Sequence, residues 1–218
     1  MTVVSNSSPL ISLAKIESFD HLQKLYGSLT ISVEVYAEVV VSGAGLPGSS
    51  EVLGSSWVQV RQVKRPDEIT AAQERFGLGM GELSTLILAK ELRADVVILD
   101  DLRARKLAQG EGFRVHGTMA ILEACFRKGL LVDLRGAYER LLKRGVFLNR
   151  DLLNRSSSIV QTAPGLGNPL SPPSEAYAFD RAKREGSKRK GKLRRARPFL
   201  QGELMTSGEV REEPRPRR

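Results

Sequence analysis

The sequence predicts an α/β fold in which a central, mostly parallel sheet is covered by helices. Short apolar runs rich in β-branched residues alternate with segments of helical period through most of the chain before residue 156. One of these runs, DVVILDD at 95–101, is apolar without interruption, which is typical of a strand buried on both faces. Such alternation with hidden strands indicates parallel strands joined by crossover helices.

The first half of this region contains three expected strands. TVVS at 2–5 precedes a helical pattern at 7–18, in which Ser8 is a suitable N-cap and Pro9 suits the first helical position. The pattern resumes after residue 18 and ends at Gly27, a residue that favours a left-handed cap. The next expected elements are a strand at 29–32, a helix at 33–43, a loop at 43–50 and a strand at 57–63.

The second half contains the clearest amphipathic helix, GELSTLILAKELRA at 81–94, which leads into the buried strand. A weaker helical pattern at 67–77 comes before it. The remaining expected elements are a helix at 102–110, a strand at 113–117 and helices at 118–129 and 134–145.

The composition changes at Ser156, so we expect a globular domain at 1–155 and a tail at 156–218. The tail begins with a Pro/Gly-rich stretch and continues with a run at 181–197 that carries ten Lys or Arg and one Glu. Most of the net charge of +9 therefore belongs to the tail, and the domain is nearly neutral. A segment with so little to bury is expected to be disordered and to suit an anionic partner.

The composition also excludes several kinds of site. Cys125 is the single cysteine, so no internal disulfide forms, and two isolated histidines, His21 and His116, do not make a zinc site. No apolar run is long enough to span a membrane, and the N-terminus lacks the pattern of a secretory signal. We therefore expect a cytoplasmic protein with no membrane association, in which any metal is bound by oxygen.

Oxygen donors follow the ends of two expected strands. Asn6 follows the first strand, and Asp100 and Asp101 end the buried strand at 95–101. Glu82 lies in the first turn of its helix, where the helix dipole favours an anion, and Glu38 lies in the helix after the second strand. Carboxylates gathered at the carboxyl edge of a parallel sheet need a cation, and oxygen ligands favour Mg²⁺ or Mn²⁺.

Four ordered blocks, VVSNSSPLISLAKI, ISVEVYAEVV, MGELSTLILAKELRADVVILDDLRARKLA and FRVHGTMAIL, resemble a PIN-like domain of the poorly characterised branch related to VapC toxins. The resemblance covers about residues 2–153. It implies a PIN-like three-layer α/β sandwich and a divalent-metal-dependent ribonuclease that acts on RNA. It also implies a small antitoxin as partner and, for many relatives, a homodimer.

The resemblance places the family's acidic positions on Asn6, Glu38, Glu82 and Asp101, with Asp100 as a near alternative for the fourth. The chain departs from the family at Asn6, where most active members have Asp. An amide oxygen can still bind a metal, but it carries no charge and cannot act as a base. The family's polar position two residues after the first acid falls on Ser8, and Thr118 falls on its Gly-Thr position. The site assignment is therefore Glu38, Glu82 and Asp101 for catalysis, with Asn6 and Asp100 as further metal ligands and Ser8, Arg103, Arg105 and Thr118 as substrate-binding residues.

Each of these residues also has a structural interpretation. Asn6 suits a turn, and Glu38 suits the solvated face of a helix. Glu82 would interact favourably with the positive end of its helix dipole. One residue of the pair Asp100 and Asp101 is expected to cap the helix at 102–110, and Thr118 is expected to cap the helix at 118–129. Arg103 and Arg105 are equally suited to a solvated helix face. The Gly-rich run at 77–81 follows a helical pattern and no strand, so it does not indicate a dinucleotide site.

Two functions remain open at this point. The ordered acidic set predicts a toxin-type endoribonuclease that hydrolyses RNA with a metal-activated water. Asn6 and the basic tail favour a catalytically weakened PIN-like protein that binds nucleic acid or regulates a partner through phosphate contacts. A third interpretation, the acidic pair of a receiver domain, is disfavoured because no later strand ends in the required acceptor Asp.

Overall fold

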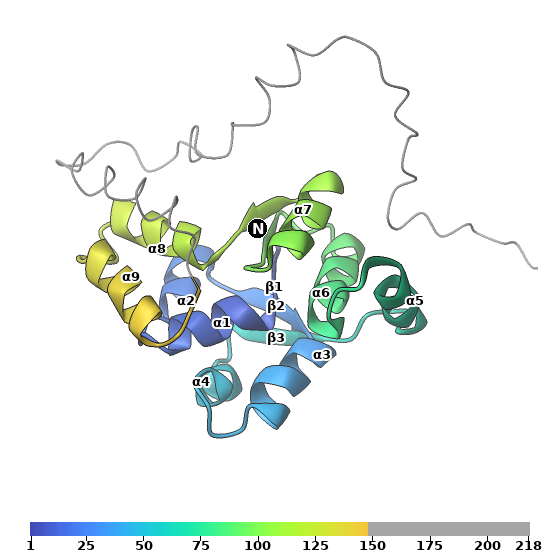
Figure 1. The fold of residues 1–218 in the computed structure, drawn as a ribbon, viewed down its shortest axis with the longest axis horizontal. Coiled ribbons are helices and arrows are strands. Elements are labelled where there is room, and N and C mark those ends of the chain that lie inside the picture. Colours follow the sequence, from blue (N-terminus) through green and yellow to red (C-terminus); the bar gives the residue numbers. More distant parts are fainter. Residues whose placement is uncertain (148–218) are drawn as a thin grey trace, which may run out of the picture. The chain divides into compact units, whose positions relative to one another are not determined.

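The structure is a computed structural model that describes residues 1–147 (Figure 1). The expected domain end at residue 155 and the basic tail at 156–218 lie outside the described residues. Within residues 1–147, no helix is long and apolar enough to cross a membrane.

Five parallel strands form one sheet in the order β3-β2-β1-β4-β5. The three inner strands are buried along their whole length, whereas the edge strand β3 exposes three of its four residues. The predicted α/β class with a parallel sheet is therefore confirmed. The strands are β1 (Val3–Ser5), β2 (Leu29–Ser32), β3 (Val58–Arg61), β4 (Val96–Ile98) and β5 (Arg114–His116).

Helices cover the sheet on both sides, which makes a three-layer sandwich (Figure 1). Helices α1, α2, α8 and α9 pack together in one group, and α5, α6 and α7 pack together in the other. Their bounds are α1 (Ser7–Ala14), α2 (His21–Tyr26), α5 (Asp67–Phe76), α6 (Met80–Glu91), α7 (Leu102–Gly110), α8 (Thr118–Arg127) and α9 (Leu134–Lys143).

One connection links the two helix layers. It runs from α3 (Val33–Tyr36) directly into a π-helical turn, η1 (Ala37–Ser42), and then to α4 (Ser49–Gly54). Helix α3 contacts α6 of one layer, and η1 contacts α1 of the other. This segment therefore closes over the carboxyl ends of the central strands.

Several local features differ from the sequence prediction. Helix α1 begins at Ser7 after the N-cap Asn6, so Ser8 is not the cap and Pro9 is not the first helical residue. The N-cap of α8 is Gly117 and not Thr118.

The first helix ends at Ala14 and not near residue 18, because Glu17 takes a left-handed conformation (φ 58°) and the Ser18 N–H donates to the Leu13 carbonyl. The helix expected at 33–43 is a short α-helix followed by the π-helical turn. Helix α4 was not expected; it begins after Gly48, whose N–H donates to the Glu51 carboxylate.

The strand order changes direction between β1 and β4. From β1 the chain moves to β2 and β3 on one side, and it then returns to place β4 against the other side of β1. Connections that leave the two neighbouring strands in opposite directions open a gap between them, which is where ligands bind in open α/β sheets. The residues that follow β1 and β4 therefore line this gap.

A buried pair of serines fixes α6 against the end of β2. The hydroxyls of Ser32 and Ser84 lie 2.7 Å apart, and neither residue is exposed. The Ser32 hydroxyl also accepts from the Val35 N–H, which caps α3, and the Ser84 hydroxyl lies within reach of the Gly81 carbonyl. The pair thus sets the position of α3 relative to α6.

We expect Ser84→Ala to lower the free energy of unfolding by about 1–2 kcal/mol, because it leaves the buried Ser32 hydroxyl with one partner fewer. Urea unfolding measures the change. The control is Ser28→Ala, at an exposed position, for which a change within about 0.5 kcal/mol is expected. Equal effects of the two substitutions would show that the serine pair does not hold the helices together.

Candidate active site

The pairing of the sheet brings the ends of β1, β4 and β5 side by side. Ser5 pairs with Ile98, and the Asn6 N–H extends the ladder by donating to the Ile98 carbonyl at 3.0 Å. On the other side of β4, the Leu99 N–H donates to the His116 carbonyl at 2.9 Å. Asn6 and the aspartates that follow Leu99 therefore leave adjacent strands at the same edge.

Asn6 and Glu82 are in direct contact. The Asn6 side chain is fully buried, and its Nδ2 donates to Glu82 Oε1 at 3.1 Å. Glu82 stands in the first turn of α6, where the positive end of the helix dipole stabilises its charge. Two residues 76 positions apart in the sequence thus meet as the sequence predicts.

Glu38 reaches the same place from the connection between the two helix layers. A Cβ atom on Gly81 would lie 2.9 Å from Glu38 Oε2 and 3.0 Å from Asn6 Oδ1, so both oxygens converge on the open side of this glycine. Glu38 is carried by the π-helical turn η1, a rare conformation that is found frequently at functional sites. The absence of a side chain at Gly81 leaves the space between the two oxygens free.

Asp100 is held by the start of α8. Its Oδ1 accepts from the Thr118 N–H at 2.8 Å, and its Oδ2 accepts from the Thr118 hydroxyl at 2.6 Å. The Arg105 guanidinium lies close by, because a Cβ on Gly117 would be 2.8 Å from Arg105 Nη1 and 3.0 Å from Asp100 Oδ1. Asp100 is thus fixed in orientation with a cation beside it.

Asp101 caps α7, as expected for one member of the aspartate pair. Its Oδ1 accepts from the Ala104 N–H at 2.8 Å, and the residue is exposed. Arg103 donates to the Phe76 and Gly77 carbonyls at 2.7 and 3.3 Å, so it ties α7 to the end of α5. Ser8 lies half-buried in the first turn of α1.

Gly81 is a part of the site that was not predicted, and Glu34 is a second residue of interest near it in the chain segment that carries Glu38. Glu34 lies one turn before Glu38, and its Oε2 is the one buried side-chain N or O atom without a hydrogen-bond partner among the described residues. The spacing of four residues between two glutamates on one helix is the signal that could have drawn attention to Glu34. Gly81 could not be recognised from sequence, because its role depends on what approaches it in space.

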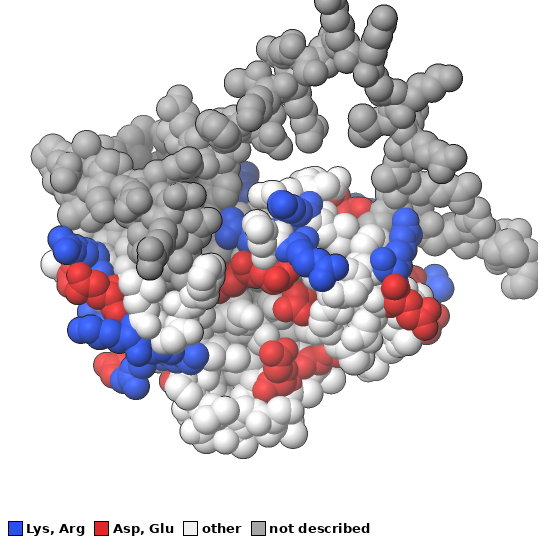
Figure 2. All heavy atoms as spheres, in the orientation of Figure 1, with Lys and Arg blue, Asp and Glu red and all other residues white. Residues whose placement is uncertain are grey.

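Acidic side chains gather in the middle of the face drawn in Figure 2, between α1, α3 and α7 as labelled in Figure 1. Lysine and arginine side chains lie above them over α7. An anionic strand that approaches this face would meet cations around an acidic centre. This charge pattern suits a phosphodiester bound through a metal ion.

The donors fit a hard divalent cation that keeps part of its water shell. Within the described part of the chain, no three Asp, Glu, His or Cys side chains lie close enough to hold one ion. The convergent group is instead one amide oxygen, of Asn6, and two carboxylates, of Glu38 and Glu82. Mg²⁺ is commonly bound by one or two carboxylates and several waters, so this smaller set suits it.

His116 is a structural residue beside the site. One ring nitrogen, Nδ1, lies 2.7 Å from the Tyr26 hydroxyl. Burial, and then the charges of Arg114 and Arg105, lower the pKa of His116 below its usual value of 6.5. The imidazole is therefore neutral in the folded protein at neutral pH, consistent with the core histidine expected from sequence.

This shift makes stability depend on pH. Below about pH 6.5 His116 takes up a proton more readily in the unfolded chain than in the folded protein, so protonation favours the unfolded state. The stability that the neutral imidazole provides is therefore present above that pH and is lost as the pH falls. We expect the wild-type protein to lose more stability than His116→Gln between about pH 7 and pH 5. Urea unfolding at several pH values tests this, and parallel pH profiles would contradict it.

Replacing the unusual amide tests the geometry of the proposed ion site. Asn6→Asp puts a carboxylate about 3 Å from Glu82, which destabilises the metal-free protein and raises its dependence on a cation. We expect Mg²⁺ or Mn²⁺ to raise the melting temperature of Asn6→Asp more than that of the wild type. Gln23→Glu, which adds one charge at an exposed position of α2, is the control. An equal response of Asn6→Asp and Gln23→Glu to the metal would contradict this arrangement.

Comparison with known proteins agrees with the geometry. The family model described as DUF3368, PIN domain, matches residues 2–162. No curated protein matches the chain. The family match covers most of the sequence and includes every element that the sheet and the convergent donors require. The chain therefore belongs to the DUF3368 family of PIN domains, a nuclease-type fold.

Proposed function

We propose that the protein is a divalent-metal-dependent endoribonuclease of the VapC toxin type. The observation that carries the proposal is the meeting of Asn6, Glu38 and Glu82 beside Gly81, at the strand-order switch of a PIN domain. Sites at this position in α/β sheets bind ligands, and acidic sites of this kind suit phosphodiester chemistry.

The metal would be Mg²⁺ or Mn²⁺, held by Asn6 Oδ1 and the carboxylates of Glu38 and Glu82. When bound, such an ion lowers the pKa of a water ligand and neutralises charge on the phosphodiester. Glu82 is oriented for this task by the Asn6 amide, which donates to one of its two oxygens and leaves the other free of that bond. Glu38 is exposed and can accept a proton from the attacking water.

The reaction proposed is hydrolysis of RNA. The water oxygen forms a bond to phosphorus, the bond from phosphorus to a ribose oxygen breaks, and that oxygen takes up a proton. Arg105, which lies near Asp100, would bind the phosphate, because a guanidinium suits that role. Thr118 then acts indirectly, because it orients Asp100 through two hydrogen bonds.

The fourth acidic position is assigned to Asp100 in this proposal, with Asp101 as its neighbour. Asp100 is oriented by Thr118 and lies half-buried, whereas Asp101 is exposed and serves as the cap of α7. Ser8 stays a candidate for substrate contact through the family resemblance, and Arg103 stays one because it follows the acidic pair closely. Arg103 would have to leave its carbonyl partners to reach a phosphate.

The resemblance to VapC toxins extends the proposal to the protein's partners and location. A toxin of this kind acts in the cytoplasm and is neutralised by a small antitoxin, and many relatives form homodimers. RNA is the substrate that the proposal requires, and the positive charge of residues 156–218 favours an additional contact with RNA phosphates.

A second function is favoured by one observation. The Asn6 amide donates to Glu82 a hydrogen bond that an ionised aspartate could not donate, so this carboxylate has a partner without a cation. This arrangement supports a PIN-like protein that binds nucleic acid without cutting it. Such a protein would bind RNA equally well with and without Mg²⁺ and would lose affinity steeply with salt.

Cleavage of RNA by the purified full-length chain tests the first function. We expect cleavage that requires Mg²⁺ or Mn²⁺ and falls at least about 100-fold in Glu82→Gln, which keeps the oxygen that accepts from Asn6 but removes the charge. Gly81→Ala should lower cleavage similarly, because its methyl group would enter the space between Glu38 and Asn6. Gly110→Ala, with no atom within 4 Å of the new methyl, is the matched control.

The outcomes separate the two functions. Metal-dependent cleavage that survives Glu82→Gln and Gly81→Ala would show that the reaction occurs elsewhere. RNA binding without cleavage by the wild type would establish the second function. Comparison of Asp100→Asn with Asp101→Asn in the same assay identifies the fourth acid, and the larger loss is expected for Asp100→Asn.

A further inference from the structure

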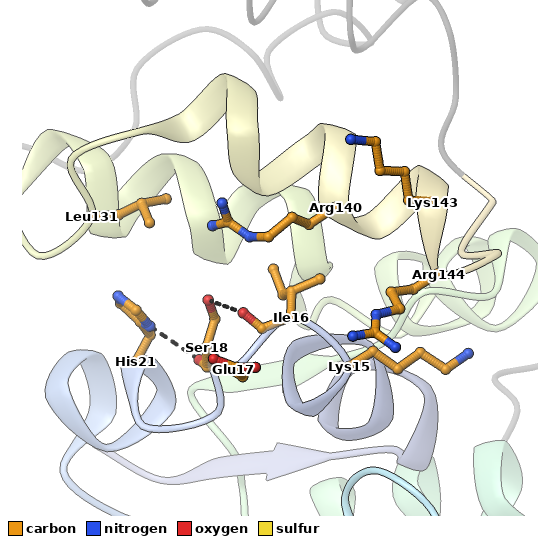
Figure 3. Close-up of a pocket in the computed structure, with 9 residues that line it drawn as sticks. All are labelled: Lys15, Ile16, Glu17, Ser18, His21, Leu131, Arg140, Lys143 and Arg144. Atoms are coloured by element: carbon orange, nitrogen blue, oxygen red, sulfur yellow. Dashed lines mark hydrogen bonds between the residues drawn. The ribbon is translucent and has the colours of Figure 1, made fainter.

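A second polar cavity, of about 580 Å³, lies at the other end of α1 from the candidate active site. Its walls are the C-terminal end of α1, the start of α2 and the last turns of α9 (Figure 3). We call it the α1–α9 pocket. It is lined by Lys15, Ile16, Glu17, Ser18, His21, Leu131, Arg140, Lys143 and Arg144.

The α1–α9 pocket is strongly basic. Four of its nine lining residues are Lys or Arg, and Glu17 is its one acidic lining residue. None of the four cations forms an ion pair within residues 1–147, whereas Arg127 and Arg135 nearby are paired with Glu123 and Glu139. The pocket therefore concentrates positive charge that the described part of the chain does not neutralise.

The directions of the side chains show which cations share the cavity. Arg140 and Arg144 extend from α9 toward the space between α9 and α1, whereas the ammonium of Lys15 is directed outward from the end of α1 (Figure 3). Lys143 points away from α1. Its positive charge is stabilised by the negative C-terminal end of the α9 dipole. Lining one pocket with Arg140 and Arg144 brings two positive charges together, and an anion bound there would offset their repulsion.

His21 is held between two backbone carbonyls at the edge of the pocket. Both ring nitrogens of His21 lie near backbone carbonyls, Nδ1 at 3.1 Å from Ser18 and Nε2 at 3.0 Å from Leu130. Glu17 holds a left-handed conformation that is costly for a residue with a side chain, and such strain is common at functional sites. The cations thus surround a preformed cavity.

Helix α1 sets the distance between the pocket and the candidate active site. Asn6 is the N-cap of α1 and Lys15 is its C-cap, so the two are separated by about 13 Å along the helix axis. A stacked strand carries one phosphate for about every 3.4 Å of its axis, so the separation corresponds to about four nucleotides. Acidic side chains and the cations around α9 appear on the same face of the molecule in Figure 2.

We propose that the α1–α9 pocket binds a phosphate group of the RNA strand that the active site cleaves, about four nucleotides from the scissile bond. This inference rests on the proposed ribonuclease function. Arg140 and Arg144 would bind the phosphate, because planar guanidinium groups match its oxygens in pairs, and Lys15 would add a third charge. The pocket would then fix the register of the strand across α1.

RNA binding by the full-length chain, measured by fluorescence anisotropy in EDTA over a series of KCl concentrations, tests the proposal. The test variant is Arg140→Ala/Arg144→Ala. The matched control is Arg127→Ala/Arg135→Ala, which removes the same charge from cations that are already paired. We expect the slope of log K against log salt to become shallower by about 1.4 in the test variant, or about 0.7 for each lost contact. The control should keep the wild-type slope.

Cleavage assays separate this proposal from the function on which it rests. With a long RNA in Mg²⁺, the test variant should raise KM several-fold with little change in kcat, and with an RNA too short to reach the pocket it should match the wild type. Wild-type RNA cleavage together with equal slopes for the test and control variants would overturn the pocket assignment alone. A wild-type protein that neither binds nor cleaves RNA would overturn the proposed function and this inference with it.

The experiments could also show that the natural ligand of the α1–α9 pocket is a small anion. If inorganic phosphate raises the melting temperature of the wild type but not of Arg140→Ala/Arg144→Ala, while RNA affinity is the same for both, the pocket binds a free phosphate compound. That result would contradict the assignment to the RNA strand.

Discussion

The parallel pairing of β1 with β4 is the constraint on which the rest of the structure depends. It joins two segments more than 90 residues apart, Val3 with Val96 through Ser5 with Ile98, and it places Asn6 next to the residues that follow β4. Because β2 and β3 lie on the other side of β1, the neighbouring connections leave in opposite directions. Polar side chains can therefore gather at this edge although β4 is wholly apolar and β1 is apolar up to Ser5.

The helices beside the sheet bring further acidic side chains to this edge. Helix α6 presents Glu82 at its N-terminus, and the segment from α3 through η1 brings Glu38 across from β2. The Ser32–Ser84 pair holds these two segments together below the site. Gly81 lies at their closest approach, where a side chain would collide with the oxygens of Glu38 and Asn6.

Much of this arrangement could be predicted from the sequence, since the strands are short apolar runs and the helices have clear periodicity. The parallel sheet and the cap at Asp101 follow from residue types at strand ends and helix starts, and the approach of Asn6 to Glu82 is what the family resemblance implies. The π-helical turn and the early end of α1 could not be predicted, because they depend on tertiary contacts and on the strained conformation of Glu17. The roles of Gly81 and of Thr118 likewise depend on side chains that approach from distant segments.

The central claim is that one divalent ion binds where Asn6, Glu38 and Glu82 meet. A crystal of the protein soaked in MnCl₂ tests it directly, because Mn²⁺ gives an anomalous signal that locates the ion without assumptions about the ligands. We predict one peak in contact with Asn6 Oδ1 and with carboxylate oxygens of Glu38 and Glu82. A peak bound by other residues, or no peak beside Gly81, would contradict the account.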